Sequence, residues 1–329
     1  MKKIIKLLIN FCFMVNLLKN KKATSYIGLS FVVLFWGFSA ITSKFYLTYF
    51  SPTFGVAFTS FISALAIAII YRKRLKNIDA TYFKTAFILG LFYCVANLSQ
   101  KIGLQYTTPT MYAFLENLSC VVVPIVVLIL CKKLPSLLQI IGSVVCLISA
   151  LVLSGLGSGA QTLNIGIGEI LCAVAGVFYG INIAGTSIYT KKLDSALYIM
   201  LVLLFESAIS FVASIIFNFV TINGTPIEAI RFSFDPLILI SRVIITLTSS
   251  ALCWIIRTNS MKHVAPTVVA VMMPFSSIIT SIISVALGMD VLTINLVAGA
   301  ILGFIAMVIC SIGDIIADKK HDKNQTNNV

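Results

Sequence analysis

The apolar residues of this chain fall into ten long runs that short polar breaks separate. A helix that crosses the hydrocarbon core of a membrane needs about 20 apolar residues, because each residue advances it by about 1.5 Å. Turn-forming pairs mark several breaks, as at Ser51-Pro52, Leu134-Pro135 and Asp235-Pro236. The pattern predicts ten membrane-spanning helices, over residues 25–47, 52–71, 82–104, 110–131, 137–156, 166–189, 196–220, 236–256, 264–288 and 293–316.

Composition indicates that lipid is the main solvent. Of the 329 residues, 59% are hydrophobic and only 11% are charged, and the mean hydropathy is +1.04. A soluble domain carries about 25% charged residues, because its surface must face water. We therefore expect an all-α polytopic membrane protein in contact with the lipid bilayer.

The distribution of basic residues predicts the orientation of these helices. With the amino terminus inside, the inner loops and tails collect all of the 24 basic residues except Lys44, Lys101, Arg231 and Arg242. Cytoplasmic loops carry such an excess of Lys and Arg. The bias also accounts for the net charge of +13 without a nucleic-acid partner. We expect a multi-pass protein of the cell (plasma) membrane with both termini cytoplasmic.

The two ends of the chain differ from the apolar runs. In residues 1–24, basic and amide residues recur on one helical stripe, which predicts a cytoplasmic amphipathic segment at the membrane interface. A basic start before an apolar stretch is also typical of a signal peptide, but no small-residue cleavage site follows. Met14 offers a second start for translation. Residues 317–329 are polar and predict a disordered cytoplasmic tail.

The layout of the chain repeats. Thr108-Pro109-Thr110 opens the fourth predicted helix, and Ala265-Pro266-Thr267 opens the ninth. Residues 25–156 and 166–316 each hold five spans, and five is odd, so the second copy enters the membrane from the opposite side. The sequence therefore predicts ten transmembrane helices as two inverted five-helix repeats. Such repeats usually enclose an alternating-access pathway near the membrane midplane.

Short motifs carry a resemblance to a known family. They include Trp36-Gly37, the run Gly103-Leu104-Gln105-Tyr106-Thr107-Thr108-Pro109, Leu115-Glu116, Gly168-Glu169, Tyr179 and Met273-Pro274. In these residues the chain resembles the EamA-type transporters of the drug/metabolite transporter superfamily, over about residues 25–316. Asn117 stands where the family often has Pro, and Cys131-Lys132-Lys133 replaces its usual Leu-Gly-Glu, with Asp290 in the acidic place only in the second half. The resemblance implies a ten-helix basket around a central cavity, and it implies no single substrate.

Two acidic residues inside the predicted spans are candidates for proton coupling. An ionisable side chain in a membrane span is costly unless it is paired or faces water. Glu116 lies early in the fourth helix, at a depth similar to that of Lys101 in the third, so the two are expected to approach one another at the cavity. A structural ion pair explains them equally well. Glu206 lies in the middle of the seventh helix without a basic partner at its depth.

Other candidates for the substrate path are uncharged. Amides on the presumed cavity helices can contact a ligand, although hydrogen bonds between helices explain them as readily. Aromatic residues can form walls for an apolar or cationic substrate, although packing is the commoner role. A proline inside a span frees a backbone carbonyl. The substrate-path candidates are Trp36, Asn97, Gln100, Lys101, Glu116, Asn117, Tyr179, Asn182, Trp254, Met273 and Pro274.

Metal, cofactor and catalytic signatures are missing from the sequence. The eight cysteines lie far apart with no Cys-x-x-Cys pair, so we expect no metal site and interpret them as small packing residues. No phosphate-binding Gly-x-x-x-x-Gly-Lys loop occurs, and no cofactor is expected. Gly299 and Gly303 have the spacing of a helix-packing face, within the fold or between the protomers of a homodimer.

These features together favour a secondary transporter. We expect alternating access at the repeat interface and export of small metabolites, amino acids or drug-like molecules. The first alternative is a flippase for a lipid or lipid precursor on the same scaffold. An integral membrane enzyme is disfavoured, because such enzymes gather Asp, His or Glu at one membrane face and this sequence shows no such cluster.

Overall fold

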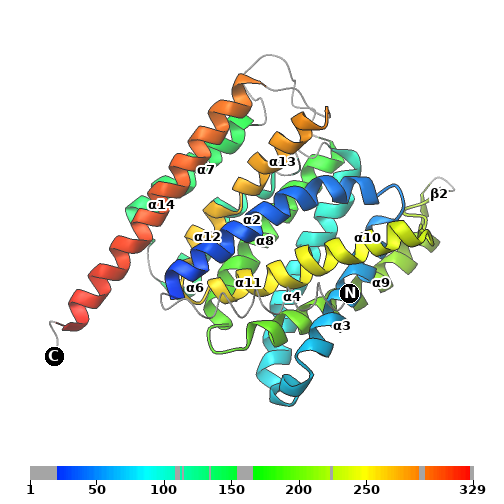
Figure 1. The fold of residues 1–329 in the computed structure, drawn as a ribbon, viewed down its shortest axis with the longest axis horizontal. Coiled ribbons are helices and arrows are strands. Elements are labelled where there is room, and N and C mark those ends of the chain that lie inside the picture. The colour runs from blue at the N-terminus through cyan, green and yellow to red at the C-terminus, as the bar shows by residue number, and fades with distance from the viewer. Residues whose placement is uncertain are drawn as a thin grey trace.

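The computed structural model describes residues 21–107, 112, 115–132, 135–153, 166–222, 225–288 and 293–326. Almost all of these residues are helical (Figure 1). The elements are α2 (Lys21–Tyr46), α3 (Pro52–Ile70), η1 (Arg72–Asn77, a 3-10 helix), α4 (Ala80–Tyr106), α6 (Ser119–Cys131), α7 (Leu137–Leu153), α8 (Ile167–Tyr189), α9 (Ser195–Phe219), β1 (Thr221–Ile222), β2 (Thr225–Pro226), α10 (Pro236–Thr246), η2 (Leu247–Leu252, a π-helix), α11 (Cys253–Ser260), α12 (Pro266–Met272), α13 (Phe275–Ala286) and α14 (Ile294–Thr326).

The described helices fit a membrane-spanning bundle. Seven helical stretches are long and apolar enough to cross a membrane: α2, α3, α4, α8, α9, the continuous stretch Pro236–Ser260, and the stretch Pro266–Ala286. Three shorter apolar helices lie within α6, α7 and α14. Each of the ten predicted ranges therefore coincides with helix. The first residues of the fourth range and the last of the fifth lie outside the described residues.

Local sequence explains where several helices begin. The side chains of Asp79 and Asp235 each accept two hydrogen bonds from backbone N–H groups in the first turn of α4 and α10. Asp194 accepts one at the start of α9. An acidic N-cap satisfies N–H groups that have no partner inside the helix. α3, α10 and α12 each begin with proline, which suits the first helical position.

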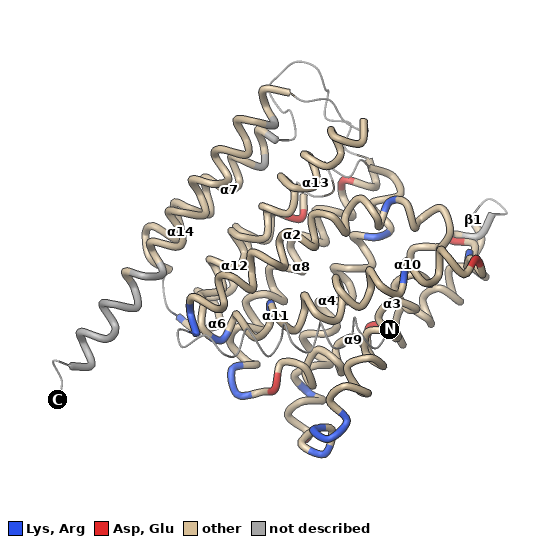
Figure 2. Tube along the Cα trace, in the orientation of Figure 1, with Lys and Arg blue, Asp and Glu red and all other residues tan. Residues whose placement is uncertain are grey.

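The outer surface of the bundle is apolar. Large side chains that no neighbour covers recur on almost every helix, including Ile129, Leu137, Phe219 and Ile294. Figure 2 shows charged residues confined to short stretches of the trace, with most of each helix free of them. A soluble monomer rarely exposes so much contiguous apolar surface. The chain is therefore a multi-pass membrane protein.

The helices pack in pairs that mirror one another between the two halves of the chain. α7 packs along α14, and the two lie side by side at one edge of the molecule (Figure 1). α3 packs on α9, and α6 contacts α12. The contact between α4 and α8 corresponds to the contact between α11 and α2. The contact between α6 and α8 corresponds to the contact between α13 and α2. Exchanging each helix of the first half for its counterpart in the second leaves this set of contacts unchanged.

The fourth helical stretch of each half is interrupted at an equivalent place. Asn117 and Leu118 form a turn before α6, and Met273 and Pro274 form one between α12 and α13. Asn117 and Pro274 each stand eight residues after the proline that opens their stretch in the sequence. Pro124, by contrast, lies inside a continuous α6.

The loops between the helices gather at two ends of the bundle. At the basic end, Arg74 pairs with Asp194 at 2.9 Å, and Lys262 Nζ donates to the Leu193 carbonyl at 2.6 Å. Partial burial lowers the pKa of Lys262 below its ordinary value. At the other end, called the Ser51 end, the Ser51 N–H donates to the carbonyl of Arg231 at 3.1 Å.

The Ser51 end is tied together by further side-chain contacts. Thr53 Oγ1 donates to Glu228 Oε1 at 2.7 Å, which holds the start of α3 against the segment before α10. Thr107 Oγ1 donates to Glu169 Oε1 at 2.6 Å, which joins the end of α4 to the start of α8. Each end therefore brings together loops from both halves of the chain.

Two details of α14 differ from or refine the sequence analysis. The helix continues to Thr326, where the sequence predicts a disordered tail from residue 317. A helix that is already nucleated gains one hydrogen bond per added residue, so polar residues can extend it. The Gly299 carbonyl accepts a hydrogen bond from Ser149 Oγ at 2.7 Å, and Gly303 faces the same serine. This small-residue face therefore packs against α7 of the same chain.

Candidate functional site

A cavity of about 1220 Å³, open space at its edge included, occupies the Ser51 half of the bundle. Side chains from α2, α3, α4, α8, α10, η2, α11 and α13 line it, together with Tyr112, Glu116 and Met273. It reaches from Arg257 and Ile183 up to Leu47, Ser51 and Pro52. Both halves of the chain therefore contribute to one polar hollow inside an apolar bundle.

Four aromatic side chains meet in the middle of the bundle. The Trp36 and Trp254 ring centroids are 5.1 Å apart, and Tyr93 packs on Trp254 at 4.4 Å, edge to face. Tyr179 lies 6.1 Å from Tyr93. The Trp36 indole donates to the carbonyl of Ser249, which belongs to the π-helix η2, at 2.9 Å. π-Helical turns often occur at functional sites, and here the widened turn places Ser249 and Ser250 in the cavity wall.

A chain of hydrogen bonds runs from the aromatic group to Glu116. The Tyr179 hydroxyl donates to Gln100 Oε1 at 2.8 Å, and Gln100 Nε2 donates to Glu116 Oε2, also at 2.8 Å. The Gln100 side chain is buried, and these two hydrogen bonds satisfy both the oxygen and the nitrogen of its amide, as a buried polar group requires. The carboxyl group of Glu116 is thereby fixed at the cavity surface.

Lys101 and Arg242 bring positive charge to the cavity. Lys101 Nζ donates to Ser43 Oγ at 3.2 Å and stands 5.9 Å from the centroid of the Tyr112 ring. The guanidinium of Arg242 lies 4.7 Å from the centroid of Tyr46. Lys101 and Glu116 both line the cavity, but the structure contains no ion pair between these two described side chains. Each is held by an uncharged neighbour.

Arg257 lies at the bottom of the cavity and is only 1% exposed. Its guanidinium stacks over Trp254 at 4.4 Å and lies 5.8 Å from Trp36. Its Nε and Nη1 have no hydrogen-bond partner among the described residues. The sequence analysis assigns Arg257 to an inner loop. The helix continues past the predicted end at residue 256, and the aromatic rings offset part of the cost of burying the charge.

Glu206 is fully buried behind the cavity wall. Its two carboxyl oxygens accept hydrogen bonds from Ser60 Oγ at 2.6 Å and from Asn97 Nδ2 at 2.7 Å. No basic side chain of the described residues pairs with it. Asn97 lines the cavity and Glu206 does not, so Glu206 reaches the cavity only through that amide.

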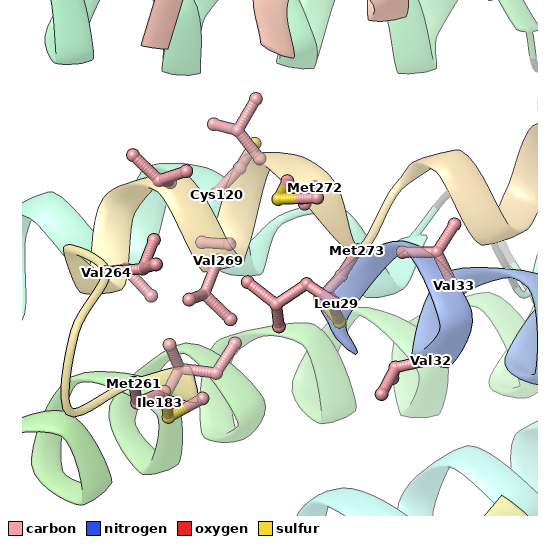
Figure 3. Close-up of a cluster of buried hydrophobic side chains, with 14 of the residues drawn as sticks. Leu29, Val32, Val33, Cys120, Ile183, Met261, Val264, Val269, Met272 and Met273 are labelled. Carbon is pink, nitrogen blue, oxygen red and sulfur yellow. The ribbon is translucent and has the colours of Figure 1, made fainter. Parts of the chain in front are cut away.

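The basic half of the bundle is filled by apolar side chains. Leu29 and Val33 of α2, Ile183 of α8 and Val269 of α12 converge in one cluster (Figure 3). A smaller pocket of about 250 Å³ lies between α4, α8, α9 and α11. Tyr93, Trp254 and Arg257 line both this pocket and the large cavity. These three residues therefore form a partition between two hollows.

The structure gathers most of the substrate-path residues that the sequence singles out. Eight of them line the cavity: Trp36, Asn97, Gln100, Lys101, Glu116, Tyr179, Trp254 and Met273. Asn182 lines the smaller pocket and donates to the Leu89 carbonyl. Asn117 and Pro274 stand at the two helix interruptions and line neither hollow.

Arg242, Arg257 and Tyr93 also line the cavity, although the sequence analysis does not select them. A signal for the two arginines exists in the sequence. Arg242, Thr246, Ser250, Trp254 and Arg257 recur at intervals of three or four residues, so they form one polar stripe on an otherwise apolar helix.

Comparisons with known proteins agree with this architecture. Residues 5–155 match the profile of the EamA-like transporter family. An "Uncharacterized transporter" of Archaeoglobus fulgidus is 23% identical over 292 residues, which cover 89% of this chain and 87% of that protein. A solved structure described as "Crystal structure of protein" shares the fold, with a TM-score of 0.70 at 13% identity over 90% of this chain and 99% of its own. The resemblance predicted from the sequence is thereby confirmed: residues 5–155 of this multi-pass membrane protein are similar to the EamA-like transporter family.

Proposed function

We propose that the protein is a secondary transporter that carries small molecules across the membrane by alternating access. The observation that carries this proposal is the cavity that both halves of the chain line inside an apolar bundle. A hollow with converging polar groups is the usual form of a small-molecule site. The EamA-like family match and the similarity to a transporter support the same class.

The proposal includes ten membrane-spanning helices in two inverted five-helix repeats. Three observations support it. The helix contacts keep their pattern when the halves are exchanged, as α7–α14, α3–α9 and α6–α12 illustrate. The fourth stretch of each half is interrupted eight residues after its proline. The family match over residues 5–155 ends close to the predicted end of the first repeat, at residue 156.

In this proposal, the partition formed by Tyr93, Trp254 and Arg257 separates the two access routes. On one side of it, the cavity reaches the Ser51 end; on the other, the small pocket lies between α4, α8, α9 and α11. Such a state is open toward one membrane face and closed toward the other. Transport then requires the halves to tilt so that the apolar cluster around Leu29 and Val269 separates and the Ser51 half closes.

The excess of Lys and Arg in the loops of the basic end supports a cytoplasmic position for that end and for both termini. The cavity then faces outward in the state described. We propose that the protein lies in the plasma membrane and works as an exporter, which takes up substrate from the cytoplasm when the basic end is open.

Glu116 is the proposed coupling group for a proton gradient. Its carboxyl group lines the cavity, so a change in its charge changes the electrostatic energy of a bound substrate. Glu206 is buried behind Asn97, so we assign it the task of holding that amide in place. No described side chains gather as a metal-binding group of three or more His, Cys, Asp or Glu residues.

Flux measurements on purified protein in liposomes test the proposal. The assay follows amino acids, nucleosides and small organic anions and cations, with and without a pH gradient. We expect saturable movement of one class, and a dependence on the gradient that Glu116→Gln abolishes. Absence of flux for every soluble class, together with movement of a labelled lipid between leaflets, would replace the transporter by a flippase.

A further inference from the structure

Positive charge dominates the inside of the cavity. Among the described residues, three cationic side chains line it, Lys101, Arg242 and Arg257, against one carboxyl group, that of Glu116. The other acid nearby, Glu206, has both oxygens occupied by Ser60 and Asn97. A guanidinium keeps its charge at neutral pH, so two of the three cations are permanent.

Arg257 is buried, whereas Lys101 and Arg242 are partly exposed, and two of its nitrogens, against one of Arg242, lack a hydrogen-bond partner among the described residues. A buried charge is expensive unless a counter-charge and hydrogen bonds satisfy it. The aromatic faces of Trp254 and Trp36 supply a cation–π contact on the plane of the guanidinium, but they cannot accept its N–H groups in the plane. These two donors, Nε and Nη1, therefore lack an acceptor among the described residues, although Arg257 lines the cavity.

The remaining surface of the site matches an anion with an apolar body. A planar carboxylate or a phosphate can take two parallel hydrogen bonds from one guanidinium. Beside the guanidinium stand the rings of Trp36, Tyr93, Tyr179 and Trp254, which suit a hydrophobic group. A cationic ligand would meet three like charges and find only Glu116 to pair with.

We propose that the substrate class is a small organic anion, with its carboxylate or phosphate on Arg257 and its apolar part against the aromatic group. Lys101 and Arg242 raise the local concentration of the anion along the way from the Ser51 end to Arg257. This inference rests on the proposed transport function, because it takes the cavity to be the substrate site.

The chain offers a direct optical test of this proposal. It contains two tryptophans, Trp36 and Trp254, and both line the cavity. Intrinsic fluorescence of the full-length protein in phosphatidylcholine nanodiscs therefore reports on the site. The probes are cyclohexanecarboxylate, cyclohexanecarboxamide and cyclohexylammonium, which share one shape, differ in charge and do not absorb near 280 nm. Cyclohexyl phosphate forms a fourth arm that distinguishes a phosphate from a carboxylate head group.

We expect saturable binding with the carboxylate or phosphate at least about tenfold tighter than the amide, and no binding of the ammonium. Arg257→Gln should weaken anion binding by about 10- to 100-fold and leave amide binding unchanged. Arg257→Lys keeps the charge but lacks the planar guanidinium. Its affinity for the anions should lie between those of the unmodified protein and of Arg257→Gln. The matched control is Arg72→Gln, an exposed arginine on η1, which should bind every probe as the unmodified protein does.

Tighter binding of the ammonium or the amide than of the anions would overturn the proposal, and so would unchanged anion binding in Arg257→Gln. Should that variant not fold, Arg257→Lys is read instead, and anion binding as tight as in the unmodified protein would overturn the proposal. Flux of the same probes in liposomes distinguishes failure of the proposed anion class from failure of the proposed transport function. Transport of the ammonium alone rejects the anion class and keeps the transporter, whereas saturable anion binding without flux of any probe keeps the site and rejects transport.

Discussion

In the proposed repeat arrangement, the two halves of the chain share a pattern of helix contacts but differ in the chemistry that they bring to the cavity. The first half contributes Gln100, Lys101 and Glu116, which are held by hydrogen bonds to neighbouring side chains. The second half contributes Arg242 and Arg257, whose guanidinium groups lie on aromatic rings. Where the first half has Glu116, seven residues after its proline, the second half has Met273.

This difference separates what the fold needs from what the ligand needs. Contacts between helices, helix interruptions and close approaches recur in both halves, as the proposed repeat requires. The charged residues do not recur, so the fold does not require them. We therefore interpret the unpaired charged side chains as part of the proposed substrate site.

Substitutions at the glycines that let paired helices approach should have the largest effect. A Cβ at position 37 would lie 2.7 Å from the Cβ of Ile279, and one at position 180 would lie 2.6 Å from the Cβ of Val122. These contacts, α2–α13 and α8–α6, are counterparts in the proposed repeat, because Ile279 and Val122 each stand 13 residues after the proline of their stretch. Gly37→Ala and Gly180→Ala should each destabilise the protein by about 3 kcal/mol, at the upper end for overpacking. Thermal unfolding in detergent measures the loss.

Gly90→Ala is the matched control, because its Cβ would have its nearest contact with Val202 at 3.6 Å, which is ordinary packing. It should leave the unfolding temperature almost unchanged. A large loss at one of Gly37 and Gly180 and none at the other would contradict the equivalence of the halves.

Glu206 should matter for stability more than for coupling. Glu206→Ala leaves the donors of Ser60 and Asn97 unsatisfied in a buried site, which costs about 2 kcal/mol. Unfolding measurements should record this loss, while the response of transport to a pH gradient persists in the folded fraction. Loss of the gradient response with unchanged stability would assign coupling to Glu206 instead.

Glu116→Gln should act in the opposite sense. The amide keeps the shape of the side chain and can still accept from Gln100, so we expect stability to change little. Transport should fall by about tenfold, which corresponds to about 1.4 kcal/mol, and its dependence on a pH gradient should vanish. Met273→Leu, at the equivalent place in the second half, should leave both properties near their original values. A gradient response that survives in Glu116→Gln would remove this residue from the coupling step.

The smallest effect is expected at the basic end. Arg74 and Asp194 form an ion pair, but the Arg74 side chain is 58% exposed. Exposed pairs of this kind contribute less than about 1 kcal/mol. Arg74→Gln should therefore unfold within a few degrees of the unmodified protein, and a larger shift would indicate that this contact controls the closed basic half.

The sequence predicted the helical ranges well, because a span of about 20 apolar residues has few other uses. It also selected Trp36, Gln100 and Glu116, since polar or aromatic residues in apolar helices are rare enough to stand out. The sequence does not predict Arg257 as a cavity residue, because a basic residue at the end of an apolar run is usually a loop residue. The structure shows that the helix continues through Arg257 to Ser260 and that the Arg257 side chain stacks on Trp254. The partners of Glu206 come from α3 and α4, and sequence spacing does not predict contacts between distant helices.

The central claim is that two inverted halves enclose one cavity that reaches a single membrane face at a time. The direct measurement is the labelling of single cysteines by a thiol reagent that does not cross membranes. Each cysteine is introduced into a cysteine-free variant that still folds. Ser43→Cys, inside the cavity, should react in intact cells, and Lys262→Cys, at the basic end, should react only after permeabilisation. Reaction of both positions from the same side of the membrane would contradict the account.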